Sequence, residues 1–156
     1  MIKMSNQLSI KSMLGVTLIA TALGLSACSK PDPDIKARQD IMKNYGDAMK
    51  SVGDMVKAPD TFDIAVVKEQ AAFLAAESAS PWQHFGNKES LGESTEAVWS
   101  NPDEFLAESE NFQKVTAEFN VAAQAATSAE DIKPTFGEVG ASCKSCHTDF
   151  KMKDEK

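Results

Sequence analysis

Apolar residues recur at alternating steps of three and four after residue 34. An α-helix turns once in roughly 3.6 residues, so this spacing places them on one helix face. Asp32-Pro33 is typical of a helix start, since the carboxylate can cap the helix and proline suits its first position. The pattern predicts a first helix that ends near Ala58-Pro59. Its stripe is Ile35, Met42, Tyr45, Met49, Val52 and Val56, interrupted only by Arg38.

Two further segments carry the same helical pattern. Asp60 or Thr61 is expected to cap the second helix, and Ser80-Pro81 to end it. Asn101-Pro102 repeats the cap-then-proline start and predicts a third helix. The apolar positions are Ile64, Val67, Ala71 and Leu74 in the second, and Phe105, Phe112, Val115, Phe119, Ala122 and Ala126 in the third.

A fourth helix is expected near the C-terminus, beginning at Ser128 or Asp131. Pro134 should lie in its first turn, because deeper in a helix proline removes a backbone hydrogen bond. Residues 81–101 are rich in polar residues and glycine, which predicts a long loop with one helical turn near Trp99. No segment shows the period-two alternation of a strand. The fold class is therefore all-α, an antiparallel four-helix bundle.

The N-terminal region has the pattern of an export signal. Lys3 and Lys11 precede an apolar run of thirteen residues from Met13 to Leu25, which is short for a membrane span. The run leads into Leu25-Ser26-Ala27-Cys28, which resembles a bacterial lipobox. We expect a lipoprotein signal peptide over residues 1–27, lipidation of Cys28, a tether over 28–34 and the bundle over 35–156. The alternative is ordinary cleavage that leaves Cys28 as a free thiol.

Charge narrows the range of partners. The 156-residue chain has a net charge of −7, and removal of Lys3 and Lys11 with the signal peptide takes −7 to −9. Basic residues are not clustered, so nucleic acid is not an expected partner. The size fits one domain. An exported chain that meets the membrane only through a lipid on Cys28 would be located in the bacterial periplasm.

Cys143-Lys144-Ser145-Cys146-His147 is the attachment signature of a c-type haem. Each thiol adds to one haem vinyl group, and the histidine presents an imidazole to the iron. On a helix, Cys146 and His147 lie about 300° and about 40° around from Cys143, so the three share one face. Phe136, Val139 and Phe150 fall on the same face. We expect one covalently bound haem c.

Other interpretations of the two cysteines are weaker. A zinc site needs further Cys or His ligands, and only Cys28 and His84 remain in the chain. A thioredoxin-like pair would accompany a βαβ pattern, which is absent from the sequence.

Nearly all of the mature sequence resembles cytochrome c′, a class II c-type cytochrome. The most specific segment runs from Phe136 to His147, and Arg38-Gln39-Asp40-Ile41-Met42 is similar to the family's first-helix motif. Pro81 to Gly86 and Trp99-Ser100 also match. Lys151 stands where several family members have arginine. The resemblance implies a haem-binding four-helix bundle and a homodimer formed through the first two helices.

The axial positions of the iron decide the function. His147 is the expected proximal ligand. For the sixth position, Met42 on the first helix either covers the iron without bonding, as the resemblance implies, or binds it. His84 is the second candidate, but its polar loop favours exposure to solvent. Met152 is too close to His147 on the same helix to reach the opposite haem face.

Other side chains are expected around the haem. Met42, Trp82 and Phe85 should form a tight, apolar distal side, and Phe136 should contact the haem while the phenylalanines of the third helix form core. The resemblance suggests that Arg38 pairs with a haem propionate, assisted by Gln39, and guanidinium geometry suits this role. Otherwise the Arg38 stem packs while its charge reaches water.

A haem with a vacant sixth position and an apolar distal side predicts a particular ligand class. NO and CO are neutral and lose little hydration there, and stable oxygen binding would need a polar donor. We expect a five-coordinate haem protein that binds NO and CO, serves in NO buffering or detoxification, and exchanges electrons with a periplasmic redox partner. The alternative is a six-coordinate, low-spin electron carrier with Met42 as axial ligand. Enzymatic peroxidase or NO reductase chemistry fits less well, since only His84 offers a polar distal group.

Overall fold

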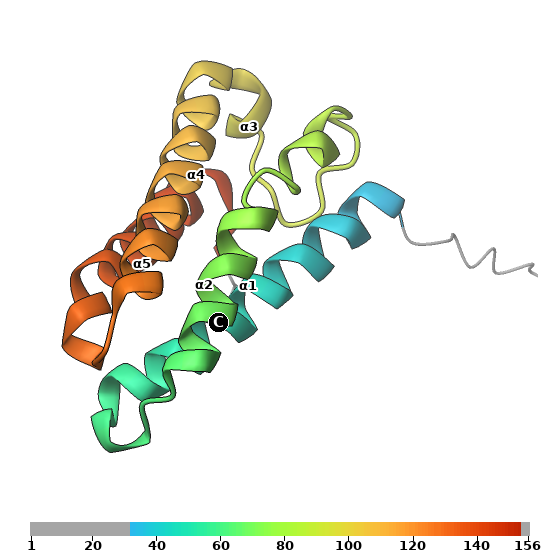
Figure 1. The fold of residues 1–156 in the computed structure, drawn as a ribbon. Helices are drawn as coiled ribbons and strands as arrows, with labels where there is room; N and C mark the ends of the chain where they lie inside the picture. The colour runs from blue at the N-terminus through green and yellow to red at the C-terminus, as the bar shows by residue number, and fades with distance from the viewer. Residues whose placement is uncertain (1–31, 154–156) are drawn as a thin grey trace, which may run out of the picture.

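The structure is a computed structural model that describes residues 32–153. Four long helices form an antiparallel bundle: α1 (Pro33–Lys57), α2 (Ile64–Glu77), α4 (Pro102–Ala125) and α5 (Ala129–Phe150) (Figure 1). Each of α1 and α4 packs against both α2 and α5. The segment between α2 and α4 contains the 3₁₀ turn η2 (Trp82–Phe85) and the short helix α3 (Ala97–Ser100). The predicted all-α, four-helix fold is confirmed.

The predicted signal peptide and the lipidation of Cys28 lie outside the described residues. Within residues 32–153, no helix combines the length and apolarity needed to cross a membrane. The first helix begins at Pro33, where Asp32-Pro33 predicted its start.

The start of α1 follows its capping sequence. One carboxylate oxygen of Asp32 accepts hydrogen bonds from the backbone N–H groups of Asp34, at 2.9 Å, and Ile35, at 3.1 Å. Pro33 occupies the first position, where a helix has no use for the N–H that proline lacks. The position of this start determines which residues of α1 face the other helices, and Arg38 and Met42 are among them.

The start of α2 differs from the expectation. Pro59–Thr61 forms a 3₁₀ turn, η1, in which Thr61 N–H donates to the Ala58 carbonyl at 2.8 Å. This turn uses the backbone around Asp60 and Thr61, so neither residue caps α2. Asp63 caps it instead, accepting from the N–H groups of Ala65, at 2.9 Å, and Val66, at 3.3 Å.

The start of α5 also corrects one expectation. Ser128 is the N-cap residue and Ala129 the first residue of the helix, so Pro134 lies in the second turn, not the first. A proline there has no N–H to donate to the carbonyl four residues earlier, and the helix continues past the missing bond. The Asp131 carboxylate secures this end, accepting from Ser128 N–H at 2.9 Å and from the N–H and hydroxyl of Thr127 at 2.9 and 3.1 Å.

These hydrogen bonds predict a pH-dependent contribution from Asp131. Bonds from Thr127 and Ser128 hold the pKa of Asp131 below its ordinary value of 3.8. Its stabilising effect is therefore present above pH 3.8 and is lost as the pH falls through the lowered pKa. Asp131→Asn should lower the urea midpoint at neutral pH, and this difference should shrink as the pH falls below 3.8. Glu130→Gln, which removes a neighbouring acid in the same turn, is the control and should have a smaller effect at neutral pH.

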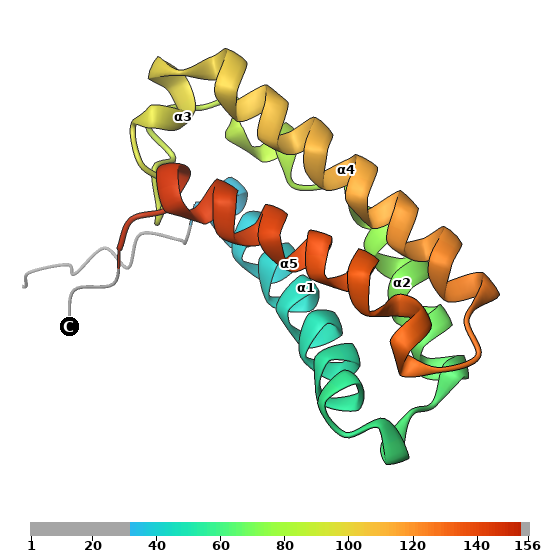
Figure 2. The same ribbon diagram turned by 90° about the vertical axis from the view of Figure 1, so that its left-hand side faces the viewer.

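A single core fills the bundle, because each helix turns its apolar stripe inward. Its largest fully buried side chains include Val52, Val67, Leu74, Phe119, Ile132 and Val139. The C-terminal end of α5, the first turns of α1 and the segment around α3 gather at the same end of the molecule (Figure 2). This end contains the Cys-Lys-Ser-Cys-His segment and two cavities.

Candidate functional site

Two adjoining cavities lie at this end of the bundle, with volumes of about 400 Å³ and about 240 Å³. Both are lined by Met42, Trp82, Cys146 and His147, so they form one continuous site, within the size range of small-molecule pockets. The larger cavity adds Ile35, Arg38, Gln39, Phe85, Glu93, Ser94, Phe105, Phe150 and Lys151, and the smaller adds Tyr45, Gly46, Met49, Phe112, Gly140, Ser142 and Cys143.

Aromatic rings form most of one wall. The Phe105 ring centroid lies 4.9 Å from that of Phe85, 5.2 Å from that of Phe150 and 5.8 Å from that of Trp82. The Trp82 indole N–H donates to the Ser78 carbonyl at 2.8 Å, so the polar edge of the indole is paired. Trp82 and Phe85 thus lie at the larger cavity and give it an apolar surface.

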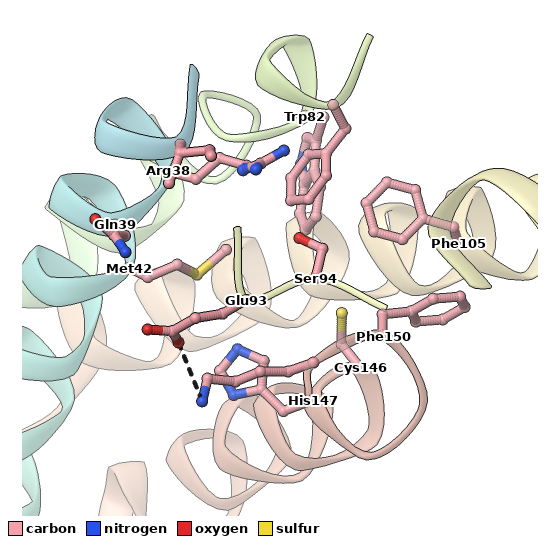
Figure 3. A pocket seen from close by; sticks show the side chains of 13 residues that line it. Arg38, Gln39, Met42, Trp82, Glu93, Ser94, Phe105, Cys146, His147 and Phe150 are labelled. Carbon is pink, nitrogen blue, oxygen red and sulfur yellow. Dashed lines mark ion pairs between the residues drawn. The ribbon is translucent and has the colours of Figure 1, made fainter. Parts of the chain in front are cut away.

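Met42 and His147 reach the same cavity from different helices. Figure 3 shows Met42 extending from α1 and His147 projecting from α5 on the facing wall. His84, the other candidate for the sixth position, lines neither cavity. Its Nδ1 lies 2.9 Å from the Asp34 carboxylate. The site therefore brings together His147 and Met42 and leaves His84 outside.

Arg38 is buried, with 6% of its surface exposed. Its guanidinium donates to the carbonyls of His84, at 3.0 Å, Leu91, at 3.2 Å, and Ser90, and its central carbon lies 4.5 Å from the Phe85 ring centroid. Burial lowers the pKa of Arg38, opposed by the charges of Asp32 and Asp34.

These contacts give Arg38 a role that neither expectation included, and its pairing with a haem propionate stays a prediction. Its charged group does not reach water, and its donors hold the backbone of the loop between α2 and α4. Tertiary contacts decide this role, because the loop carbonyls lie about fifty residues along the chain from α1. Gln39, the neighbouring residue, lines the larger cavity and is exposed to solvent.

The loop also closes over the end of α5. Glu93 pairs with Lys151 at 3.2 Å, shown by the dashed line in Figure 3. Thr95 N–H donates to the Phe150 carbonyl at 2.9 Å, and Met152 N–H donates to the Glu93 carbonyl at 2.8 Å. Sequence reasoning missed Glu93 and Ser94, since a polar loop carries no signal of where it folds back.

Phe136 and Phe105 exchange the roles expected of them. Phe136 lines neither cavity, and its ring centroid lies 5.7 Å from that of Phe119 in the middle of the bundle. It shares the angular face of Cys143, but seven residues along a helix amount to about 10 Å of axial distance. Phe105, expected in the core, lines the larger cavity because α4 begins at this end.

The surroundings of the thiols and the imidazole favour their uncharged forms. Burial raises the pKa of Cys143, and burial followed by the charge of Glu108 raises that of Cys146 to about 11. Desolvation, followed by the charge of Lys151, lowers the pKa of His147, against a smaller effect of Glu93. Neutral imidazole is the form that ligates metals. Residues 32–153 contain no cluster of three or more Cys, His, Asp or Glu side chains that could hold a metal ion.

Comparison with known families decides the identity. A family model described as Cytochrome C′ matches residues 34–151. The chain belongs to the cytochrome c′ family. A cytochrome c′ of Alcaligenes xylosoxydans is 30% identical over 125 residues, which cover 80% of this chain and 98% of the relative.

Solved structures agree with this assignment. A ferrous variant of Alcaligenes xylosoxidans cytochrome c′ with bound NO has a TM-score of 0.73 and 30% identity, over 81% of this chain and 98% of that one. A carbon monoxide-bound variant of the same protein also has a TM-score of 0.73 and 30% identity, over 80% and 98% of the two chains.

Cytochromes c′ carry covalently bound haem c, and so does this protein. The residues of the site fit that group. Two half-buried thiols on one helix open onto apolar cavities, and an imidazole one residue further on opens onto the same space.

Proposed function

We propose that this cytochrome c′ binds NO and CO at the iron of its haem. In this proposal Cys143 and Cys146 attach the haem to α5, and His147 is the proximal ligand. Bound haem supplies an iron with an open coordination position, while the chain determines what reaches it. The observation that carries the proposal is the apolar wall of Met42, Trp82 and Phe85 on the cavity that His147 also lines.

The wall selects ligands through desolvation. A charged ligand would lose its hydration among Met42, Trp82 and Phe85 without compensation, whereas NO and CO have little hydration to lose. Both terminal nitrogens of Arg38 donate to loop carbonyls, which directs these hydrogen bonds away from a bound ligand. A bound oxygen molecule, which is stabilised by a distal hydrogen bond, would be retained poorly.

Relatives add support for the ligand class. The structures of the Alcaligenes xylosoxidans protein include one with bound NO and one with bound CO. We extend this ligand class to the present chain and propose that the protein buffers or detoxifies NO. In this proposal it acts as a binding protein and not as an enzyme. Electron exchange with a redox partner is compatible with the same haem.

The cellular setting belongs to the same proposal. The leader over residues 1–27 and the lipobox-like Leu25 to Cys28 support export to the periplasm and anchoring through a lipid on Cys28. We also propose a homodimer through α1 and α2, which the resemblance to the family suggests.

The alternative function is a six-coordinate electron carrier in which Met42 ligates the iron. The observation that favours it is the direction of the Met42 side chain, which extends into the cavity that His147 also lines. No other methionine lines both cavities within the described part of the chain.

An absorption spectrum of the reduced protein with and without CO separates these functions. The gas-binding proposal expects a high-spin spectrum that changes when CO is added, because the sixth position is open. A sharp low-spin spectrum that CO leaves unchanged would contradict it and support the electron carrier. The same titration with NO tests the second ligand.

A further inference from the structure

Helix α4 contacts the haem-attachment segment, residues 142–147, through two hydrogen bonds. Each bond is made to the residue before a cysteine. The Ser145 hydroxyl donates to Glu108 Oε1 at 2.6 Å, and Asn111 Nδ2 donates to the Ser142 hydroxyl at 3.3 Å. Ser145 precedes Cys146 and Ser142 precedes Cys143. Glu108 therefore brings a carboxylate directly to the attachment segment.

Glu108 lies on α4 between two aromatic residues that line the cavities. Phe105, three residues earlier on α4, and Phe112, four residues later, both line the cavities. Glu108 Oε2 is buried and has no hydrogen-bond partner among residues 32–153. Burying a carboxylate oxygen is costly unless a hydrogen bond compensates it, so the position of Glu108 calls for an explanation.

We infer that Glu108 is the carboxylate that holds the reduction potential of the haem down. A negative charge stabilises the oxidised iron more than the reduced iron, since the oxidised form carries one more positive charge. Charge near a haem and burial of its surroundings are both means by which a protein sets this potential. Because Oε2 is shielded from water, its field is screened less than that of a surface carboxylate.

Other acidic groups near the site are less suited to this role. Glu93 lies 3.2 Å from the ammonium of Lys151, which offsets its charge, and Asp149 is exposed on α5. The partner of Glu108 is the neutral hydroxyl of Ser145, which leaves the charge in place. The inference does not depend on whether the iron is five- or six-coordinate.

The test is a redox titration of haem-loaded Glu108→Gln, which has nearly the same shape and still accepts from Ser145. We expect the reduction equilibrium to shift towards the reduced form by on the order of tenfold, estimated for a partly shielded charge. For a one-electron couple, a tenfold shift is about 59 mV. Glu110→Gln is the control, since Glu110 is exposed on the same helix and the variant loses the same charge.

Two results would overturn the inference. One is a shift in Glu108→Gln no larger than that in Glu110→Gln. The other is a shift that added salt abolishes, which would indicate a screened surface charge. Haem content and the CO response should stay unchanged, which separates this inference from failure of the gas-binding proposal.

A second variant keeps the test decisive if Glu108→Gln does not fold. Asn111→Asp introduces a carboxylate beside Ser142, the residue before Cys143. Glu108 contacts the equivalent residue before Cys146. Asn111→Asp should lower the potential relative to the wild type, by less than Glu108→Gln raises it because Asn111 is exposed. An unchanged or raised potential in Asn111→Asp would contradict the inference.

Discussion

Truncation of Met42 to alanine is expected to speed CO binding to the reduced protein by roughly tenfold, the effect of a barrier lowered by about 1.4 kcal/mol. Met42 extends into the cavity that His147 also lines, so under the gas-binding proposal an incoming ligand must displace its side chain. Alanine removes the atoms that have to move. Stopped-flow mixing of the reduced protein with CO measures the rate.

Met49→Ala is the matched control for this prediction. Met49 lies on the same helix two turns later and lines only the smaller cavity, so the same truncation should change the CO rate little. An equal acceleration in both variants would indicate general loosening of the bundle. If Met42→Ala converts a low-spin spectrum to a high-spin one, Met42 was an axial ligand and the electron-carrier function is correct.

The helices could be predicted because their signals are local. Asp32-Pro33 and Asn101-Pro102 each combine a cap position with a proline at the first helical position, and α1 and α4 begin there. The cap of α2 could not be assigned in the same way. Asp60, Thr61 and Asp63 are all suitable cap residues, and the choice depends on how η1 uses the intervening backbone.

The functional site likewise has residues that local sequence signals place and residues that only tertiary packing places. Cys143, Cys146 and His147 share a face through helix periodicity alone, and the structure has them on one helix opening onto the two cavities. Phe136 shows the limit of periodicity, since it gives the direction of a side chain but not which part of the bundle lies opposite. The position of Phe105 at the cavity depends on where α4 begins relative to α5, which is a tertiary relation.

Arg38 shows why an interrupted stripe is ambiguous in sequence. A charged residue among apolar positions must find partners or reach water, and the sequence contains candidates for both. The actual partners are three backbone carbonyls, which are present in every loop whatever its side chains. Sequence can therefore identify Arg38 as unusual but cannot say what it binds.

Replacement of Arg38 by alanine should lower the free energy of unfolding by about 3 kcal/mol, since several buried hydrogen bonds to a charged group are lost and their carbonyls are left unpaired. Arg38 holds the loop between α2 and α4 through the carbonyls of His84 and Leu91, and the same loop contains Phe85, which lines the larger cavity. The loss should therefore extend to the cavity wall. Urea denaturation of the haem-loaded protein, followed by circular dichroism, measures the change.

Two further variants distinguish this role from a simple charge effect. Arg38→Lys keeps the charge but lacks the planar fork that reaches several acceptors, so its stability should fall between those of alanine and wild type. Lys36→Ala removes an exposed cation from the same turn of α1 and should change stability little, because its ion pair with Asp40 is on the surface. If Arg38→Ala unfolds at the wild-type midpoint, the three carbonyl contacts contribute little. Equal stability of the lysine and wild-type proteins would instead mean that charge alone holds the loop.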